Sequence, residues 1–174
     1  MEDAPPREQP SSSRDKISFE PSQAWFLVLA AVVVGLDQLT KWFIRLWVEP
    51  GESIPADGLL RIVHVTNSGA AFGFFQNAAP LLAVTSIIGM VAILIYLFNP
   101  GFAHPLMRAG LALMLGGAIG NLIDRVYAGE VVDFIKAPNF PAFNLADSAI
   151  TVGVLLLIWT MLVEAETKTD EEPT

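Results

Sequence analysis

The sequence of 174 residues contains no cysteine and only two histidines, and these absences exclude several kinds of chemistry. Without cysteine there is no disulfide framework, thiol nucleophile or cysteine-based metal cluster. The histidines are His64 and His104, and no HExxH pattern is present, so the sequence offers no zinc motif. The sequence also contains no GxSxG motif, which would indicate a serine hydrolase. We therefore expect neither a cofactor nor a metal ion.

Charged residues are also scarce, at 16% of the chain, with eighteen acidic residues against ten basic ones. With a net charge of −8, the chain lacks the clustered basic residues that are typical of nucleic-acid-binding proteins. Nucleic acid is therefore excluded as a partner. Much of the negative charge lies near the ends: residues 1–23 contain five acidic and three basic residues, and residues 164–174 contain five and one. These ends are expected to be solvated tails, the first of them disordered because it is rich in Pro and Ser.

Long apolar runs dominate the rest of the chain, and 53% of all 174 residues are hydrophobic. They predict four transmembrane helices, over about residues 24–44, 78–98, 106–126 and 144–163. The second run has no charged residue, and as a helix it would be ~32 Å long, enough to cross a bilayer core. The predicted fold class is an all-α membrane protein, with one four-helix domain over residues 24–163.

The connections between the runs differ in length. The first, residues 45–77, contains a stretch from Leu59 to Val65 that is rich in β-branched residues and predicts a short strand. Four spans place both tails and the short connection near residues 99–105 on one side, and the two long connections on the other. Lys and Arg divide equally between the two sides, so the positive-inside rule does not decide the orientation.

Three of the apolar runs contain charged residues, each costing at least ~2.5–3.5 kcal/mol at membrane depth. Asp37 and Lys41 share one face of the first helix and could form a local ion pair. In the third run Asn121 and Asp124 share a face, with Arg125 next in sequence. The alternative to a functional role here is a helix-packing seam closed by an Asp124–Arg125 pair. Both interpretations stay open.

Two further carboxylates lie in short apolar segments at the same membrane surface. Asp133 follows the third run, and Asp147 begins the fourth. Taken singly, Asn144 could be a helix N-cap and Asp147 a first-turn carboxylate favoured by the helix dipole. Taken together, two acids in such a setting hold different protonation states, and this arrangement can activate water for peptide hydrolysis.

Two other classes of function compete with this hypothesis. A small transporter could use Asp133 and Asp147 to relay protons, although transporters usually place such groups at mid-span and often contain repeats. No internal repeat is evident, and both carboxylates fall at helix ends. A non-enzymatic assembly subunit could instead use the small residues at 116–120 as a packing face.

Five short motifs resemble those of one known family, the bacterial lipoprotein signal peptidases (signal peptidase II), which are membrane aspartyl proteases. The motifs are DQLTK at 37–41, NSGAAFG at 67–73, GNLIDR at 120–125, VVDF at 131–134 and FNLAD at 143–147. They occur in the family's order, and the resemblance covers residues 24–163. One departure is the short segment 135–142 between the last two motifs, which puts the reach of that loop in question.

The resemblance implies a role for each matching residue. Asp133 and Asp147 match the catalytic dyad, and Asp124 matches a supporting position while remaining a rival to Asp133. Asp37 and Lys41 match a motif that supports the site. Polar positions around the substrate are matched by the following residues: Asn67, Asn121, Arg125 and Asn144.

The resemblance also implies a substrate and a location. The substrates would be prolipoproteins carrying a diacylglyceryl-modified cysteine, cleaved just before that cysteine. The protein would lie in the bacterial cytoplasmic (inner) membrane in contact with lipid, with both termini cytoplasmic and the active site towards the periplasmic face. The β-containing connection after the first helix would then be periplasmic, and we expect a monomer.

Overall fold

The computed structural model describes residues 24–69, 79–99 and 104–170. The disordered tail expected at residues 1–23 lies outside this range, as do residues 70–73 of the second motif.

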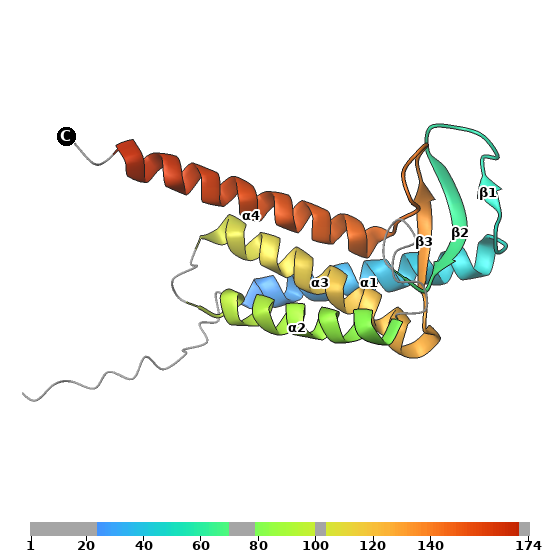
Figure 1. Ribbon diagram of the computed structural model, residues 1–174, viewed down its shortest axis with the longest axis horizontal. Helices are drawn as coiled ribbons and strands as arrows, with labels where there is room; N and C mark the ends of the chain where they lie inside the picture. The colour runs from blue at the N-terminus through green and yellow to red at the C-terminus, as the bar shows by residue number, and fades with distance from the viewer. Residues whose placement is uncertain (1–23, 70–78, 100–103, 171–174) are drawn as a thin grey trace, which may run out of the picture.

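Helices form the bulk of the described chain (Figure 1), and four of them are long and apolar enough to cross a membrane. They are α1 (Ala24–Trp47), α2 (Ala79–Leu97), α3 (Pro105–Ala128) and α4 (Leu145–Asp170). The four helices coincide with the predicted spans to within a few residues at most of their ends. The exception is α4, whose helical backbone continues past residue 163 to Asp170, into the segment expected to be a tail.

The ends of α3 follow from local sequence. Pro105 occupies its first turn, where a missing N–H costs no intrahelical hydrogen bond. At the other end Gly129 adopts a φ of 75°, and its N–H donates to the carbonyl of Arg125. Glycine tolerates this left-handed conformation, which ends the helix and turns the chain towards the next strand.

A small antiparallel sheet closes one end of the bundle. Its strands lie in the order β1 (Ser53–Ile54), β2 (Arg61–Asn67) and β3 (Val131–Lys136). The predicted strand corresponds to β2, shifted by two residues. The expectation that the β structure belongs to the connection after the first helix was incomplete, because β3 comes from the connection after α3. Figure 1 shows the strands crossing the end of the bundle where α1 and α3 finish and α4 begins.

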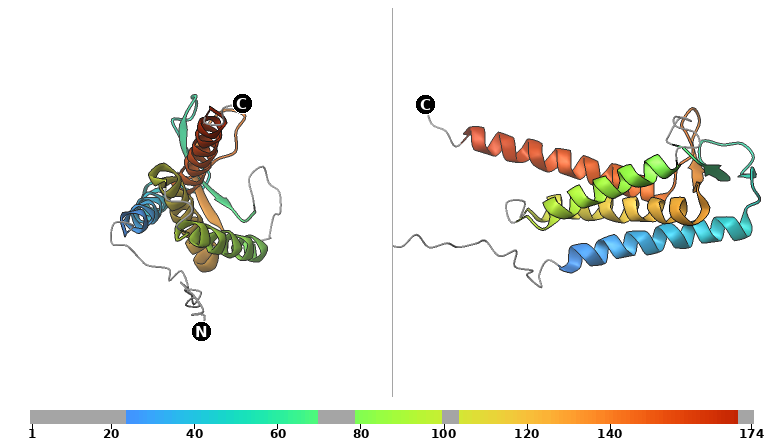
Figure 2. Two further views of the ribbon diagram at one scale, coloured as in Figure 1. Left: turned by 90° about the vertical axis from the view of Figure 1, so that its left-hand side faces the viewer. Right: turned by 60° about the horizontal axis from the view of Figure 1, so that its bottom comes forward.

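The bundle is organised around α3, which packs against each of the other three helices. Seen end-on, α3 lies between α1, α2 and α4 (Figure 2). Its contact with α4 is close because glycines face each other: a Cβ added to Gly110 would lie 2.8 Å from the carbonyl oxygen of Gly153. Small residues permit such backbone approach in membrane helices, where packing replaces the hydrophobic effect. Gly117, further along α3, likewise faces the backbone of Ala146 in the first turn of α4, so this close packing extends to the start of α4.

Candidate active site

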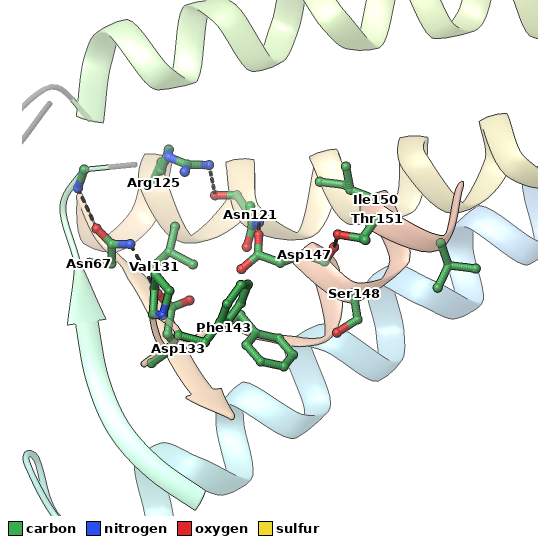
Figure 3. A pocket seen from close by; sticks show the side chains of 15 residues that line it. Asn67, Asn121, Arg125, Val131, Asp133, Phe143, Asp147, Ser148, Ile150 and Thr151 are labelled. Atoms are coloured by element: carbon green, nitrogen blue, oxygen red, sulfur yellow. Dashed lines mark hydrogen bonds between the residues drawn. The ribbon is translucent and has the colours of Figure 1, made fainter. Parts of the chain in front are cut away.

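A cavity of about 540 Å³ lies where the sheet meets the ends of α3 and α4. Figure 3 shows the side chains that surround it. Polar and charged residues of its lining include five expected from the sequence: Asn67, Asn121, Arg125, Asp133 and Asp147. Phe140, Phe143, Ile150 and Val152 supply apolar walls. The cavity therefore combines a compact polar group with space for an apolar ligand.

Asp133 reaches the cavity from β3 and is almost fully buried, with 4% of its surface exposed. Its two carboxylate oxygens accept hydrogen bonds from Asn67 Nδ2 at 3.2 Å and from Asn144 Nδ2 at 2.8 Å. Burial, and after it the negative charge of Asp147, raise the pKa of Asp133 to about 6. A carboxyl group with this pKa holds a proton far more readily than an exposed aspartate does.

Asp147 lies in the first turn of α4 and forms a reciprocal cap with Asn144. The N–H of Asp147 donates to Asn144 Oδ1 at 2.9 Å, and the N–H of Asn144 donates to Asp147 Oδ2 at 3.3 Å. This is the hydrogen-bond pattern of a capping box. The capping interpretation of these two residues is therefore confirmed, and the same cap holds Asp147 at the cavity.

Two asparagine side chains connect the carboxylates. Asn121 Nδ2 donates to Asp147 Oδ1 at 2.8 Å. Asn144 Nδ2 donates both to Asp133 Oδ1 and, at 3.1 Å, to Asn121 Oδ1. Asn144 thus contacts both acids, and its own side chain is fully buried. The two carboxylates are held in one hydrogen-bonded group of side chains from α3, β3 and α4.

Asn67 and Arg125 form the edge of this group. Asn67 ends β2, and its Oδ1 accepts the N–H of Gly69 at 2.9 Å, so the side chain is fixed by a tight bend. The sequence Asn67-Ser68-Gly69 consists of residue types that are typical of turns. Arg125 donates from Nη1 to the carbonyl of Asn121 at 3.4 Å and lines the cavity. Its positive charge is available to a ligand there.

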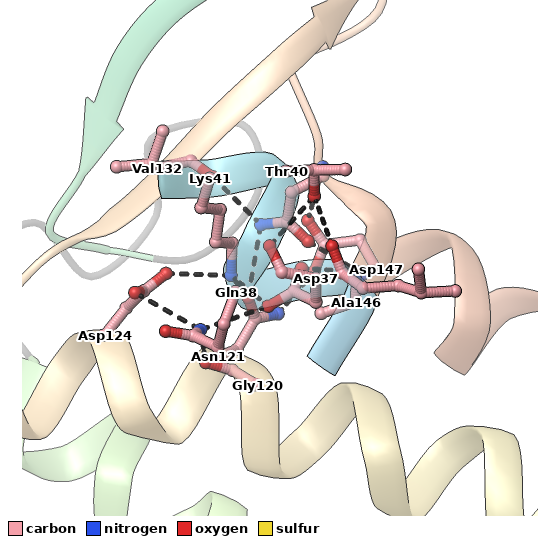
Figure 4. A network of polar contacts seen from close by, with 12 residues as sticks. Asp37, Gln38, Thr40, Lys41, Gly120, Asn121, Asp124, Val132, Ala146 and Asp147 are labelled. Atoms are coloured by element: carbon pink, nitrogen blue, oxygen red, sulfur yellow. Dashed lines mark hydrogen bonds and ion pairs between the residues drawn. The ribbon is translucent and has the colours of Figure 1, made fainter. Parts of the chain in front are cut away.

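A second polar cluster lies deeper between α1 and α3 and does not line the cavity (Figure 4). Lys41 Nζ forms ion pairs of 2.8 Å with Asp37 Oδ2 and with Asp124 Oδ2. Asp124 Oδ1 accepts from Arg45 Nη2 at 2.9 Å. The Asp37–Lys41 pair predicted from their spacing is confirmed. Asp124 pairs with these α1 cations, whereas the alternative considered from sequence paired it with Arg125.

Two further residues of this cluster, Gln38 and Arg45, were not expected from the sequence. Gln38 Nε2 donates to the carbonyl of Gly120 at 3.0 Å, which links α1 to α3. Arg45 follows Lys41 by four residues, just as Lys41 follows Asp37. That spacing puts all three on one helix face and could have identified Arg45 as part of the cluster.

Neither histidine lines the cavity that holds Asp133 and Asp147. His64 is on β2, and its Nδ1 lies 2.8 Å from the carbonyl oxygen of Val48. It borders a separate cavity with Arg45 and Glu130. Within the described residues, no group of three or more His, Asp or Glu side chains could hold a metal ion.

The cavity contains the elements of acid–base hydrolysis. Two carboxyl groups line it, burial raises the pKa of one of them, Asp133, and amide and guanidinium groups surround both acids. Both acids lie at the end of the bundle where α4 begins, not at mid-span, which argues against a transport pathway.

Comparison with known proteins places this architecture in a family. The family model described as "Signal peptidase (SPase) II" matches residues 29–163. The chain belongs to the signal peptidase II family. It is therefore a protease, and the resemblance drawn from the five motifs is confirmed. Membership and the four apolar helices together indicate a multi-pass bacterial membrane protein.

Similar sequences and structures support this membership of the signal peptidase II family. The chain is 45% identical over 142 residues to the lipoprotein signal peptidase of Moorella thermoacetica, covering 80% of this chain and 94% of that protein. It is 48% identical over 139 residues to that of Geobacillus kaustophilus, covering 77% and 90%. A solved bacterial membrane enzyme aligns with a TM-score of 0.79 at 33% identity, over 87% of this chain and 95% of the other.

Proposed function

We propose that this protein is an aspartic endopeptidase that removes the signal peptide from prolipoproteins, cleaving before a diacylglyceryl-modified cysteine. The relatives named lipoprotein signal peptidase support this substrate class. The single observation that carries the chemistry is that Asp133 and Asp147 line one cavity and both bind Asn144. Water held between the two carboxyl groups would be the nucleophile, with no cofactor involved.

In this mechanism Asp147 is the base and Asp133 the acid. Asp147 accepts hydrogen bonds from Asn121 Nδ2 and from the N–H of Asn144 at the N-terminus of α4, and these fix the position of its carboxylate. Asp147 takes a proton from water as the oxygen attacks the scissile carbonyl. Asp133 donates its proton to the carbonyl oxygen, and burial, which raises its pKa, increases the protonated fraction that can do so. Collapse of the tetrahedral intermediate then returns a proton to the leaving amine.

The remaining polar residues would hold the substrate. A peptide at this depth brings N–H and C=O groups that are costly to leave unpaired away from water. Asn67 and Asn121 each have a second amide N–H beside the one that binds an acid, and Arg125 offers several N–H donors towards carbonyl oxygens. The apolar walls, including Phe140 and Ile150, would accept the hydrocarbon part of the modified cysteine.

The proposed location follows the family. The sheet end of the bundle would face the periplasm, with both termini in the cytoplasm and the helices in contact with lipid. The large apolar side chains exposed on α2, such as Ile88 and Ile95, suit contact with acyl chains. We also propose that the protein is a monomer, as expected from the sequence.

The proposal is tested with purified protein in detergent and a synthetic peptide containing a diacylglyceryl-cysteine. We expect cleavage at the bond preceding that cysteine, detected by mass spectrometry of both fragments. The matched control is the same peptide with an unmodified cysteine, which we expect to be cleaved poorly. Equal cleavage of both peptides would contradict the proposed substrate, and cleavage of neither would contradict the proposed function.

A further inference from the structure

Lys41 connects the deep ion cluster to the side chains of the cavity. Its ammonium group contacts Asp37 Oδ2 and Asp124 Oδ2 at 2.8 Å and donates to Asn121 Oδ1 at 2.9 Å. Lys41 is fully buried, so these three groups surround an ammonium ion that has three N–H bonds to give. Figure 4 shows Lys41 extending from α1 towards Asn121 on α3.

This contact determines which way the Asn121 amide faces. An ammonium group only donates, so the atom that Asn121 turns towards Lys41 must be its oxygen. Asn144 Nδ2 supplies a second donor to the same oxygen at 3.1 Å. With Oδ1 held by two donors, Asn121 Nδ2 points the other way and donates to Asp147 Oδ1 at 2.8 Å. A flipped amide would turn its oxygen towards a carboxylate, which is repulsive.

We propose that Lys41 is a positioning residue for Asp147: it holds the Asn121 amide in the one orientation that donates to this carboxylate, and so controls when the dyad is ionised. The proposal rests on the assignment of Asp133 and Asp147 as the dyad. The charged groups around the dyad are Arg125 at the cavity and, behind Asn121, the Asp37–Lys41–Asp124 cluster.

The competing explanation is that Lys41 only stabilises the bundle by pairing two buried carboxylates. Arg45 provides a matched control for it. Arg45 also pairs with Asp124 from α1, but its side chain is partly exposed and the structure gives it no hydrogen bond to Asn121. A structural role predicts that loss of either cation lowers stability without changing the ionisation of the dyad. The positioning role predicts that only loss of Lys41 changes it.

Replacing Lys41 alone would leave buried carboxylates without a partner and could prevent folding. The principal variant is therefore Lys41→Met combined with Asp37→Asn, which removes one charge of each sign. The new amide oxygen at position 37 can still accept the N–H of Ala146, which Asp37 Oδ1 binds at 2.9 Å. Asp124 retains Arg45. Asp37→Asn alone and Arg45→Gln serve as controls.

The first measurement is the pH profile of kcat and KM for the diacylglyceryl-cysteine peptide. In the principal variant we expect the acid limb of kcat to move to higher pH by about one unit, as for loss of a hydrogen bond to an ionised group. The ratio of the parent's kcat to the variant's kcat should then be about tenfold larger at acid pH than at neutral pH. The KM of the variant should differ from the parent's by less than about twofold. Both controls should keep the parent's profile.

The second measurement needs no substrate. Titration of the dyad by NMR, with ¹³C-labelled aspartate carboxyl groups in detergent, should show the same upward shift in the principal variant. When Asn121→Ala is also present, the further loss of Lys41 should add no shift, because the proposed effect passes through Asn121. A parent protein that cleaves nothing would refute the proposed function while leaving this titration decisive.

Three outcomes would overturn the proposal. The first is a principal variant with a lower melting temperature but an unchanged titration of the dyad. The second is an equal shift in Arg45→Gln. The third is an undiminished effect of removing Lys41 in the Asn121→Ala background.

Discussion

Asn144 donates a 2.8 Å hydrogen bond to Asp133, so the residue that caps α4 also holds the carboxyl group carried by β3. Backbone contacts reinforce this link, because Phe143 pairs with Ile135 of β3 just before the helix begins. The segment between the two acids is short, and the pairing of Phe143 with Ile135 makes the residues between them a closed loop. The two carboxyl groups therefore hold a fixed relation even though they come from different elements.

The first prediction concerns the two acids themselves. Asp133→Asn and Asp147→Asn should each abolish cleavage while the protein stays folded, because an amide neither takes a proton from water nor donates an acidic one. Cleavage of the diacylglyceryl-cysteine peptide is measured at matched concentrations of folded enzyme. Near-normal turnover by either variant would contradict the two-aspartate mechanism.

The second prediction separates Asp124 from the dyad. Asp124 is tied by ion pairs to Lys41 and Arg45 and does not line the cavity. Asp124→Asn should therefore lower the melting temperature, because breaking a buried ion pair costs about 3–5 kcal/mol, while some cleavage remains. Single-turnover rates at saturating substrate make the comparison. A well-folded variant that binds peptide and never cleaves it would move the dyad to Asp124 and Asp147.

The third prediction concerns substrate positioning. Asn67→Ala and Arg125→Ala should slow cleavage without abolishing it, because each removes donors from the cavity and leaves both acids in place. The expected loss is ~0.5–1.5 kcal/mol for one neutral hydrogen bond and ~1.5–3 kcal/mol where the arginine charge takes part. Values of kcat/KM relative to the parent give these energies. Two variants as active as the parent would exclude the positioning role.

The fourth prediction is a pH dependence of stability. Folding raises the pKa of Asp133 from 3.8 to about 6, so the folded protein binds this proton more tightly than the unfolded chain does. The resulting stabilisation is present at low pH and is lost as the pH rises from about 4 to about 6. Over that range Asp133 should remove about 2–3 kcal/mol from the free energy of unfolding.

The measurement for this prediction is thermal unfolding in detergent at several pH values. Asp133→Asn should unfold with a flatter pH dependence than the parent, whatever its stability at any single pH. Parallel curves for the two proteins would show that this proton does not couple to folding.

Much of the helical architecture was predictable because its signals are local. A run of about 20 apolar residues specifies a membrane helix almost independently of its surroundings, since the bilayer sets the required length. Asn144 and Asp147 likewise predict the start of a helix, because they are three residues apart, as the N-cap and N3 residues are. The ion pair of Asp37 and Lys41 also follows from spacing on one helix.

The four spans, the motifs and most residues that line the candidate site could be predicted from the sequence alone. How these residues pair depends on the tertiary structure, which brings Asp124 to α1 rather than to its neighbour Arg125, β3 beside β2, and Lys41 against Asn121. These contacts join positions about 65 to 85 residues apart, which no local periodicity encodes. They depend on glycine-mediated approach of α3 to its neighbours, because a buried charge pairs with whichever group the packing brings within reach.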